Sequence, residues 1–290
     1  MSTMTEPEQQ QQQGYAYSFP RVVRSEWIKM VTLRSTWWLL IVTVVVNIGF
    51  AAIMVFAEKW VLNNPDTVGV ADQNLMLTVS VVSACGVFGQ LTFVILSILI
   101  ITNEFSSGMS RSTFAVVPRR SAVLVAKMVV ISAWCVIVFG VSVIVSWILG
   151  YMALQGTPGI DLSLTSGTSV RIIGGFIIEM VLMALFFFAL GVIIRSSAGA
   201  IGAAVGVIWI LPILASLVTN IVVGASEPTG WRKTLVDVTA FLPTRAGSVI
   251  TNARIDPSAV LGPWQGLGVL CGWAVIALVI AFLLTSNRDV

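Results

Sequence analysis

The sequence predicts an all-α protein that is embedded in a membrane, with six transmembrane helices and an N-terminal interfacial helix. Of its 290 residues, 57% are hydrophobic and only 10% are charged, and the mean hydropathy is +0.96. A soluble domain usually carries about 25% charged residues. Six apolar stretches reach the length of roughly 20 residues that a helix needs to cross the hydrocarbon layer. They are longer than barrel strands and do not alternate in polarity, which favours helices.

Composition also excludes several classes of function. The net charge of +3 is small and dispersed, so no basic groove for nucleic acid is expected. The chain has no histidine, which removes imidazole metal sites and histidine-dependent catalysis, and no metal site is predicted. Cys85, Cys135 and Cys271 each lie inside an apolar run and are interpreted as small hydrophobic residues rather than as a disulfide framework.

The chain divides into three parts. Residues 1–19 form a polar tail that is predicted to be disordered, with five consecutive glutamines at 9–13. Residues 20–35 form an amphipathic helix, and residues 36–290 form one transmembrane domain. The predicted spans are 37–57, 77–101, 128–149, 172–194, 198–223 and 267–284.

The distribution of lysine and arginine predicts the orientation of the spans. With the N-terminus inside, ten of these residues lie on the cytoplasmic side and six lie outside. Cytoplasmic loops carry the excess of positive charge, so both termini are placed in the cytoplasm. An inner loop at 102–127 then connects the second and third spans, and the longest outer loop covers 224–266.

Residues 20–35 have the pattern of a helix that lies on the membrane surface. Arg24 and Lys29 fall on a polar arc, whereas Trp27 lies on the apolar arc at the depth of the lipid headgroups. Glu26 interrupts the apolar arc. Such a helix would orient the first span or contact a cytoplasmic partner; a plain positive flank of that span is the alternative.

The inner loop 102–127 is the most informative segment. Glu104 and Phe105 close the second span, Gly108 permits a break in the helix, and Pro118 ends any helix between them. This pattern predicts a short helix held at the inner surface between two spans, with a carboxylate at one end and cations at the other. An ordinary basic loop would also fit the spacing alone.

Four segments resemble bacterial ABC transporter permeases of the type-2 (ABC-2, exporter) family. Residues 104–111 read EFSSGMSR and are followed by VPRR at 117–120, which looks like the family's inner loop. The N-terminal segment RSEWIK at 24–29, with LRSTWW at 33–38, is similar to the family's N-terminus. RSSAGAI at 195–201 resembles its turn between the fourth and fifth spans, and FLPTRAG at 241–247 resembles the segment before its last span.

The resemblance implies a connecting helix at the N-terminus and a coupling helix in the first inner loop. It also implies two kinds of partner: a second permease chain, which is the same or a paralogue, and two copies of a cytoplasmic ABC ATPase. The permease chains would lie in the bacterial plasma membrane. The coupling role would fall on the following residues: Glu104, Phe105, Gly108, Met109, Arg111, Pro118 and Arg119. Threonine is common in the family where this chain has Met109.

The sequence contains no stretch of the form GxxxxGK[ST], and none of its four lysines lies in such a context. Without this phosphate-binding loop the chain is not expected to hydrolyse ATP by that mechanism. We therefore expect no cofactor on this chain and no catalytic residue, with ATP and Mg²⁺ bound by the partner subunit.

Glu179 is the one charged residue well inside an apolar run. A charge at the bilayer centre costs at least about 2.5 kcal/mol unless it is paired, faces a cavity or is protonated. We expect Glu179 to line a substrate path or a dimer seam. The alternative is a protonated carboxyl group that is hydrogen-bonded to a neighbouring span, with Asn47 or Gln90 as mid-membrane partners.

The fifth span and the last outer loop carry further signals. Gly202 and Gly206 form a stripe of small residues that fits either packing within the chain or a dimer seam, and Pro212 should bend the fifth span. Residues 231–242 carry apolar side chains at helical spacing, which predicts an amphipathic segment at the outer interface or a plain loop.

Three classes of function compete. The first is the membrane half of an ATP-driven exporter that moves a lipophilic or amphipathic substrate outward. The second is a secondary transporter or channel that uses Glu179, but the chain shows no inverted repeat. The third is a polytopic membrane enzyme, which the lack of histidine and of a clustered acidic motif disfavours.

Overall fold

The structure of the protein is a computed structural model that describes residues 18–64, 75–106, 120–156, 160–223, 230–253 and 259–287. Regular structure in these ranges is helical apart from the two-residue strands β1 (Leu75–Met76) and β2 (Ile160–Asp161), which pair in parallel. Six helices in this part of the chain are long and apolar enough to cross a membrane. The predicted all-α, membrane-embedded fold class is therefore confirmed.

The helices extend beyond the predicted spans at most of their ends. The apolar membrane-crossing stretches run over Arg34–Val61, Phe88–Phe105, Ser121–Leu154, Gly167–Ile194, Ser197–Ile221 and Pro263–Thr285. An apolar-run criterion stops at the first polar residues, whereas a helix continues through the interfacial region until its backbone is capped. The extensions follow from this difference.

The inner loop is consequently shorter than the predicted 102–127. Helix α3 (Leu77–Ser106) continues past Glu104, and α5 (Arg120–Leu154) begins before Lys127. The predicted short helix between them lies outside the described residues, as do five of the residues assigned to it: Gly108, Met109, Arg111, Pro118 and Arg119.

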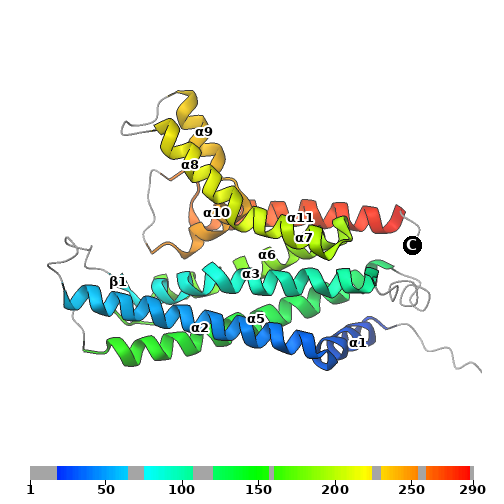
Figure 1. The fold of residues 1–290 in the computed structure, drawn as a ribbon, viewed down its shortest axis with the longest axis horizontal. Helices are drawn as coiled ribbons and strands as arrows, with labels where there is room; N and C mark the ends of the chain where they lie inside the picture. The colour runs from blue at the N-terminus through cyan, green and yellow to red at the C-terminus, as the bar shows by residue number, and fades with distance from the viewer. Residues whose placement is uncertain are drawn as a thin grey trace, which may run out of the picture.

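Two N-terminal helices meet at a single residue. Helix α1 (Phe19–Thr32) ends at Leu33, whose extended backbone also begins α2 (Arg34–Asn63). Figure 1 shows α1 lying at one end of the bundle that α2, α3 and α5 form. The C-terminal end of α11 (Pro263–Asn287) lies at the same end.

Aromatic rings fill the centre of the bundle. Phe139 of α5 lies edge-on to Phe93 of α3 and to Phe176 of α6 (Gly167–Ile194), with ring centroids 5.5 and 5.6 Å apart. All three side chains are at most 2% exposed. Edge-to-face pairs of this kind contribute about 0.5–1.5 kcal/mol beyond the area they bury, so they fix α3, α5 and α6 against one another.

The fifth span is interrupted, as Pro212 predicts. It consists of α7 (Ser197–Val205), a π-helical turn η1 (Gly206–Ile210) and α8 (Leu211–Val223). Proline has no N–H to donate, and its ring would collide with the carbonyl group four residues earlier, at Ile208. The wider π turn removes this conflict. Beyond the turn, α8 leaves the bundle together with α9 (Trp231–Thr239) (Figure 1).

The predicted outer loop 224–266 is not wholly outside the bundle. It contains α9, α10 (Pro243–Ser248) and the 3₁₀ turn η2 (Val249–Thr251), and α11 already starts at Pro263. Trp231 and Val238 of α9 are 69% and 61% exposed, which suits the predicted amphipathic segment. In contrast, Ala246 and Ile250 are fully buried, so α10 and η2 are inserted among the spans.

Glycines and one arginine hold the inserted segment. A Cβ atom on Gly175 of α6 would lie 2.1 Å from the Ile250 side chain, and one on Gly266 of α11 would lie 2.2 Å from the Ala246 carbonyl oxygen. Arg171 of α6 donates hydrogen bonds to the carbonyl oxygens of Ile250, Asn252 and Ala253. Irregular backbone at membrane depth is tolerated where protein groups satisfy it in this way.

The close approach of α10 to α11 predicts opposite effects for two glycines of one helix. Gly266→Ala places a methyl group against the backbone of Ala246, which cannot rotate away, and overpacking of this kind costs about 1–3 kcal/mol. At Gly272 nothing lies within 4 Å of the added Cβ atom. Gly272→Ala should therefore be neutral or stabilise the helix by about 0.5–1 kcal/mol. Thermal unfolding in detergent micelles measures both, and equal stabilities would contradict this packing.

Candidate functional site

Four charged side chains form a cluster at the end of the bundle that carries α1. They are Glu26 and Lys29 of α1, Glu104 of α3 and Lys127 of α5, and we call them the inner charge cluster after the predicted inner loop 102–127. The Lys127 ammonium group lies 2.5 Å from a Glu26 oxygen and 2.7 Å from a Glu104 oxygen. The Lys29 ammonium group lies 2.7 Å from Glu26 and 3.2 Å from Glu104.

Burial makes Lys127 the central member of this cluster. Its side chain is 2% exposed and those of Glu26 and Glu104 are 5% and 11% exposed, whereas Lys29 is 35% exposed. Two cations and two carboxylates cancel each other, so the cluster as a whole is neutral. Removing one partner of a buried pair costs about 3–5 kcal/mol because a charge is left behind, whereas an exposed pair contributes about 0–1 kcal/mol.

Lys29 remains protonated in this environment. Burial lowers its pKa, but the hydrogen bond to Glu26 and the negative charges of Glu104 and Glu26 raise it by more, so the net pKa lies above the ordinary value for lysine. The stabilisation from Lys29 is therefore present at neutral pH. It is lost only when the pH rises through the raised pKa of the folded protein.

Tryptophan rings attach α1 to the third span. Trp27 stacks on Trp134 of α5 with ring centroids 5.1 Å apart and an interplanar angle of 18°. Trp37, in the first turn of α2, meets the same ring edge-on at 5.9 Å. Trp27 thus packs against protein as well as lying on the apolar arc of α1. Arg24 lies on the exposed side of the helix.

The turn between the fourth and fifth spans joins the same end of the molecule. Arg195 has a left-handed backbone, with φ at 57°, and ends α6. Its guanidinium group lies 5.2 Å from the centre of the Phe105 ring, within the range of a cation–π interaction. Ser196 caps α7 by accepting a hydrogen bond from the backbone of Gly199. Described parts of three of the four family-like segments therefore converge on one end of the bundle.

A cavity lies beside the inner charge cluster, between α1, α2 and α3. It has a volume of about 460 Å³ and is lined by polar groups of the cluster and by apolar side chains such as Leu39, Leu96 and Ile100. The cluster thus forms one wall of a hollow at the end of the spans.

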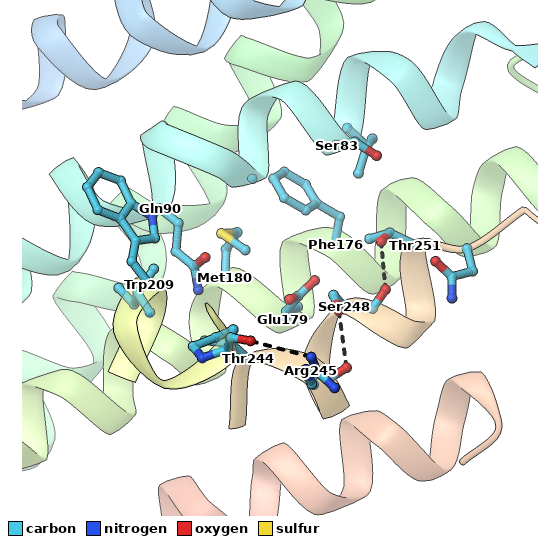
Figure 2. Close-up of a pocket in the computed structure, with 15 residues that line it drawn as sticks. Ser83, Gln90, Phe176, Glu179, Met180, Trp209, Thr244, Arg245, Ser248 and Thr251 are labelled. Carbon is cyan, nitrogen blue, oxygen red and sulfur yellow. Dashed lines mark hydrogen bonds between the residues drawn. The ribbon is translucent and has the colours of Figure 1, made fainter. Parts of the chain in front are cut away.

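A second cavity surrounds Glu179, about halfway along α6. It has a volume of about 440 Å³ and lies between α3, α6, the π turn η1 and the inserted α10–η2 segment. Figure 2 shows Glu179 and Gln90 on its wall, together with Phe176, Met180 and Trp209. Glu179 is 4% exposed and Gln90 is 8% exposed. We call this space the Glu179 cavity.

Hydrogen bonding in the Glu179 cavity is incomplete. The Gln90 Nε2 and Thr244 Oγ1 atoms are buried without a hydrogen-bond partner. No group in the described ranges forms a hydrogen bond or ion pair with the Glu179 carboxylate. The Gly247 backbone is so near that a Cβ atom there would lie 3.0 Å from a Glu179 oxygen. Protein atoms therefore enclose the carboxylate without satisfying it.

Arg245 lines the same cavity but its guanidinium group is engaged elsewhere. It donates to the Thr239 hydroxyl at 3.0 Å, the Ser216 hydroxyl at 2.6 Å and the Pro212 carbonyl oxygen at 3.4 Å. These bonds connect α10 to α9 and α8. Arg245, which belongs to the FLPTRAG segment at 241–247, thus holds α8, α9 and α10 together.

The other residues predicted for the path or seam lie apart from the cavity. Asn47 is fully buried between α2, α3 and α5, where its amide donates to the Ser142 hydroxyl at 3.2 Å. Gln90, not Asn47, therefore shares the cavity with Glu179. Gly202 and Gly206 face open space, because nothing in the described chain lies within 4 Å of a Cβ atom built on either.

Sequence reasoning missed Glu26 and Lys127 as site residues. Glu26 stood out as a charge on the apolar arc of α1, and Lys127 stood at the edge of an apolar run. An acid and a base that both sit where burial is expected signal a pair, but nothing in the sequence places α1 beside α5. Arg245 was one of the predicted outer charges and part of the FLPTRAG segment at 241–247, but it was not assigned a role in a site.

No protein-family model matches the chain, and no curated protein matches it.

The burial of the inner charge cluster predicts a large difference between its two lysines. Lys127→Met leaves two buried carboxylates without their main partner and should lower the free energy of unfolding by about 3–5 kcal/mol. Lys29→Met, in the same cluster but half exposed, should lower it by less than about 1 kcal/mol. Denaturant unfolding in micelles measures both.

A second substitution checks the cause of the loss. Adding Glu26→Gln to Lys127→Met removes one of the unpaired charges and should restore part of the stability. If the two lysine variants lose equal stability, or if the double variant is the weaker one, Lys127 does not hold a buried ion pair.

Proposed function

We propose that the chain is the membrane-spanning permease subunit of an ATP-driven exporter of the ABC-2 type in the bacterial plasma membrane. Two copies of a separate cytoplasmic ABC ATPase would bind ATP and Mg²⁺. This chain would hold no cofactor and catalyse no reaction. The cargo would be lipophilic or amphipathic and would move outward. The proposal rests on the four family-like segments and on the geometry of the inner charge cluster.

The inner charge cluster is the observation that carries the proposal. It joins α1, the end of α3 and the start of α5, which are the elements on both sides of residues 107–119. A buried, mutually satisfied ion cluster breaks only at a high free-energy cost. A force applied to α1 or to the segment 107–119 would therefore reach the first three spans together.

Arg195 extends this connection to the fourth and fifth spans. Through its contact with the Phe105 ring, the α6–α7 turn sits against the end of α3. Closure of two ATPase subunits below this end would thus tilt several spans as a unit. Rigid-body movement of packed helices is a common route by which a local event changes access to a distant cavity.

The fifth span supports a second permease chain. Only 17% of its most apolar stretch is buried, compared with 56% in the fourth span. Gly202 and Gly206 leave its surface open to close approach, as small residues do at helix interfaces within membranes. We infer that a second copy or a paralogue packs here, with lipid covering the rest.

A secondary transporter or channel that uses Glu179 is the alternative, and one observation favours it. A buried carboxylate that has no partner in the described part of the chain lines a cavity, as an ion or proton pathway would require. Transport by proteoliposomes of this chain alone, driven by a proton gradient, would support this alternative and contradict the ATP-driven exporter.

Association with an ATPase gives the direct test. The chain should copurify with an ABC ATPase encoded beside it, and ATP hydrolysis should depend on the pair. Arg24→Glu reverses an exposed charge on α1 and should weaken copurification about tenfold or more, because the proposal pairs the basic face of α1 with an acidic surface of the ATPase. Lys233→Glu reverses an exposed charge on α9, at the far end, and should leave it unchanged. Equal effects of the two reversals would argue against α1 as the docking element.

The same two positions test the predicted orientation. In a background with Cys271→Ser, which removes the exposed native cysteine, Lys233→Cys should react with a membrane-impermeant maleimide on intact cells. Arg24→Cys should react only after the membrane is opened, because the positive-inside distribution places α1 in the cytoplasm. The reverse labelling pattern would invert the topology and remove α1 from the reach of a cytoplasmic ATPase.

A further inference from the structure

The Glu179 cavity contains polar groups that the protein itself leaves unmatched. Glu179 is 4% exposed and has no hydrogen-bonding partner among the described residues, and Gln90 Nε2 and Thr244 Oγ1 are also buried without one. Buried polar groups in native proteins are nearly always hydrogen-bonded, to protein, water or ligand, so several groups without a protein partner around one space mark it as a place for a polar occupant. The volume of about 440 Å³ lies within the range of about 300–1,000 Å³ that is typical of ligand pockets.

The walls of the cavity define what kind of occupant fits. Trp209 and Phe176 present aromatic rings, and Met180 adds a polarisable thioether. Trp209 is held in place by an edge-to-face contact with Phe88, with ring centroids 5.6 Å apart. Aromatic faces attract cations, most strongly where water is excluded. An apolar surface of this kind also favours a ligand with hydrophobic substituents.

The charges around Glu179 point to the sign of that ligand. Arg245 is the cation on the described wall, and three hydrogen bonds direct its guanidinium group toward α8 and α9. On α6 itself, Arg171 lies more than two helical turns away and donates to the carbonyl oxygens of 250, 252 and 253. Neither cation forms an ion pair with Glu179. Among the described residues, the carboxylate in this partly aromatic cavity therefore has no counter-ion.

We propose that the Glu179 cavity binds an organic cation with apolar substituents, with the Glu179 carboxylate as its counter-ion and Trp209 and Phe176 against its apolar groups. Gln90 would contact polar atoms of the same ligand. That this cation is the cargo of the exporter rests on the proposed function. That the cavity binds such a cation depends on the cavity alone. The inserted α10 closes one side of the site, because Gly247 lies against Glu179.

Binding to the purified chain tests the inference without an ATPase partner. Tetraphenylphosphonium and the smaller benzyltrimethylammonium serve as cationic probes, and tetraphenylborate is the anionic counterpart of the first. Equilibrium dialysis against the chain in nanodiscs should show saturable binding of at least one cation. Glu179→Gln, which keeps the shape and removes the charge, should weaken it about tenfold or more.

Matched variants separate the site from general effects on folding. Glu58→Gln removes a carboxylate on α2 that is hydrogen-bonded to Ser80, outside the cavity, and should not alter binding. Gln90→Glu adds a second carboxylate to the cavity and should increase the affinity for the cation. This gain keeps the test decisive even if Glu179→Gln folds poorly.

Three results would overturn the proposal: no saturable binding of either cation, tetraphenylborate binding as tightly as tetraphenylphosphonium, or unchanged cation binding in both Glu179→Gln and Gln90→Glu. The last result would mean that Glu179 is simply a protonated, packed carboxyl group. Because none of these measurements uses ATP, cation binding without ATPase association would refute the exporter and retain the site. ATPase association without cation binding would do the reverse.

Discussion

Lys127 joins two carboxylates that lie far apart in the sequence, and the inner end of the molecule depends on this contact. Glu26 comes from the helix before the first span and Glu104 from the end of the second, and both reach the same buried ammonium group. None of the three charges would be tolerated at this depth alone, so each requires the others. The angle of α1 against the bundle follows from this requirement together with the stack of Trp27 on Trp134.

Among the described residues around α8, α9, α10 and η2, polar groups are joined by hydrogen bonds rather than by ion pairs. There the chain turns back into the bundle, and two arginines form hydrogen bonds with the returning segment. Arg171 donates to backbone carbonyl oxygens in and just after η2, and Arg245 connects α10 to α8 and α9. Glycines permit the backbone contacts on which this insertion depends. The charges of the inner charge cluster are thus paired with one another, whereas the Glu179 cavity remains as a space between α6 and the inserted segment.

Hydropathy was sufficient to find the six membrane-crossing helices, because length and apolarity alone determine which helices can span a bilayer. It also identified Glu179, Gln90 and Pro212 as exceptional within their spans, and the structure places all three around one cavity. The insertion of α10 could not be predicted, since FLPTRAG at 241–247 is too short and too polar to resemble a buried helix. Glu26 and Lys127 were visible only as irregularities. Their pairing depends on the packing of α1 across α5, and a local pattern carries no information about contacts between distant segments.

Leu33 gives this architecture a mechanical property. It is the single non-helical residue between α1 and α2, with φ at −81° and ψ at 117°. With one residue between them, the end of α1 and the start of α2 cannot separate, so a displacement of the end of α1 is passed to the start of the first membrane-crossing helix. The junction therefore couples the positions of the two helices, whereas rotation about the Leu33 backbone sets the angle between them.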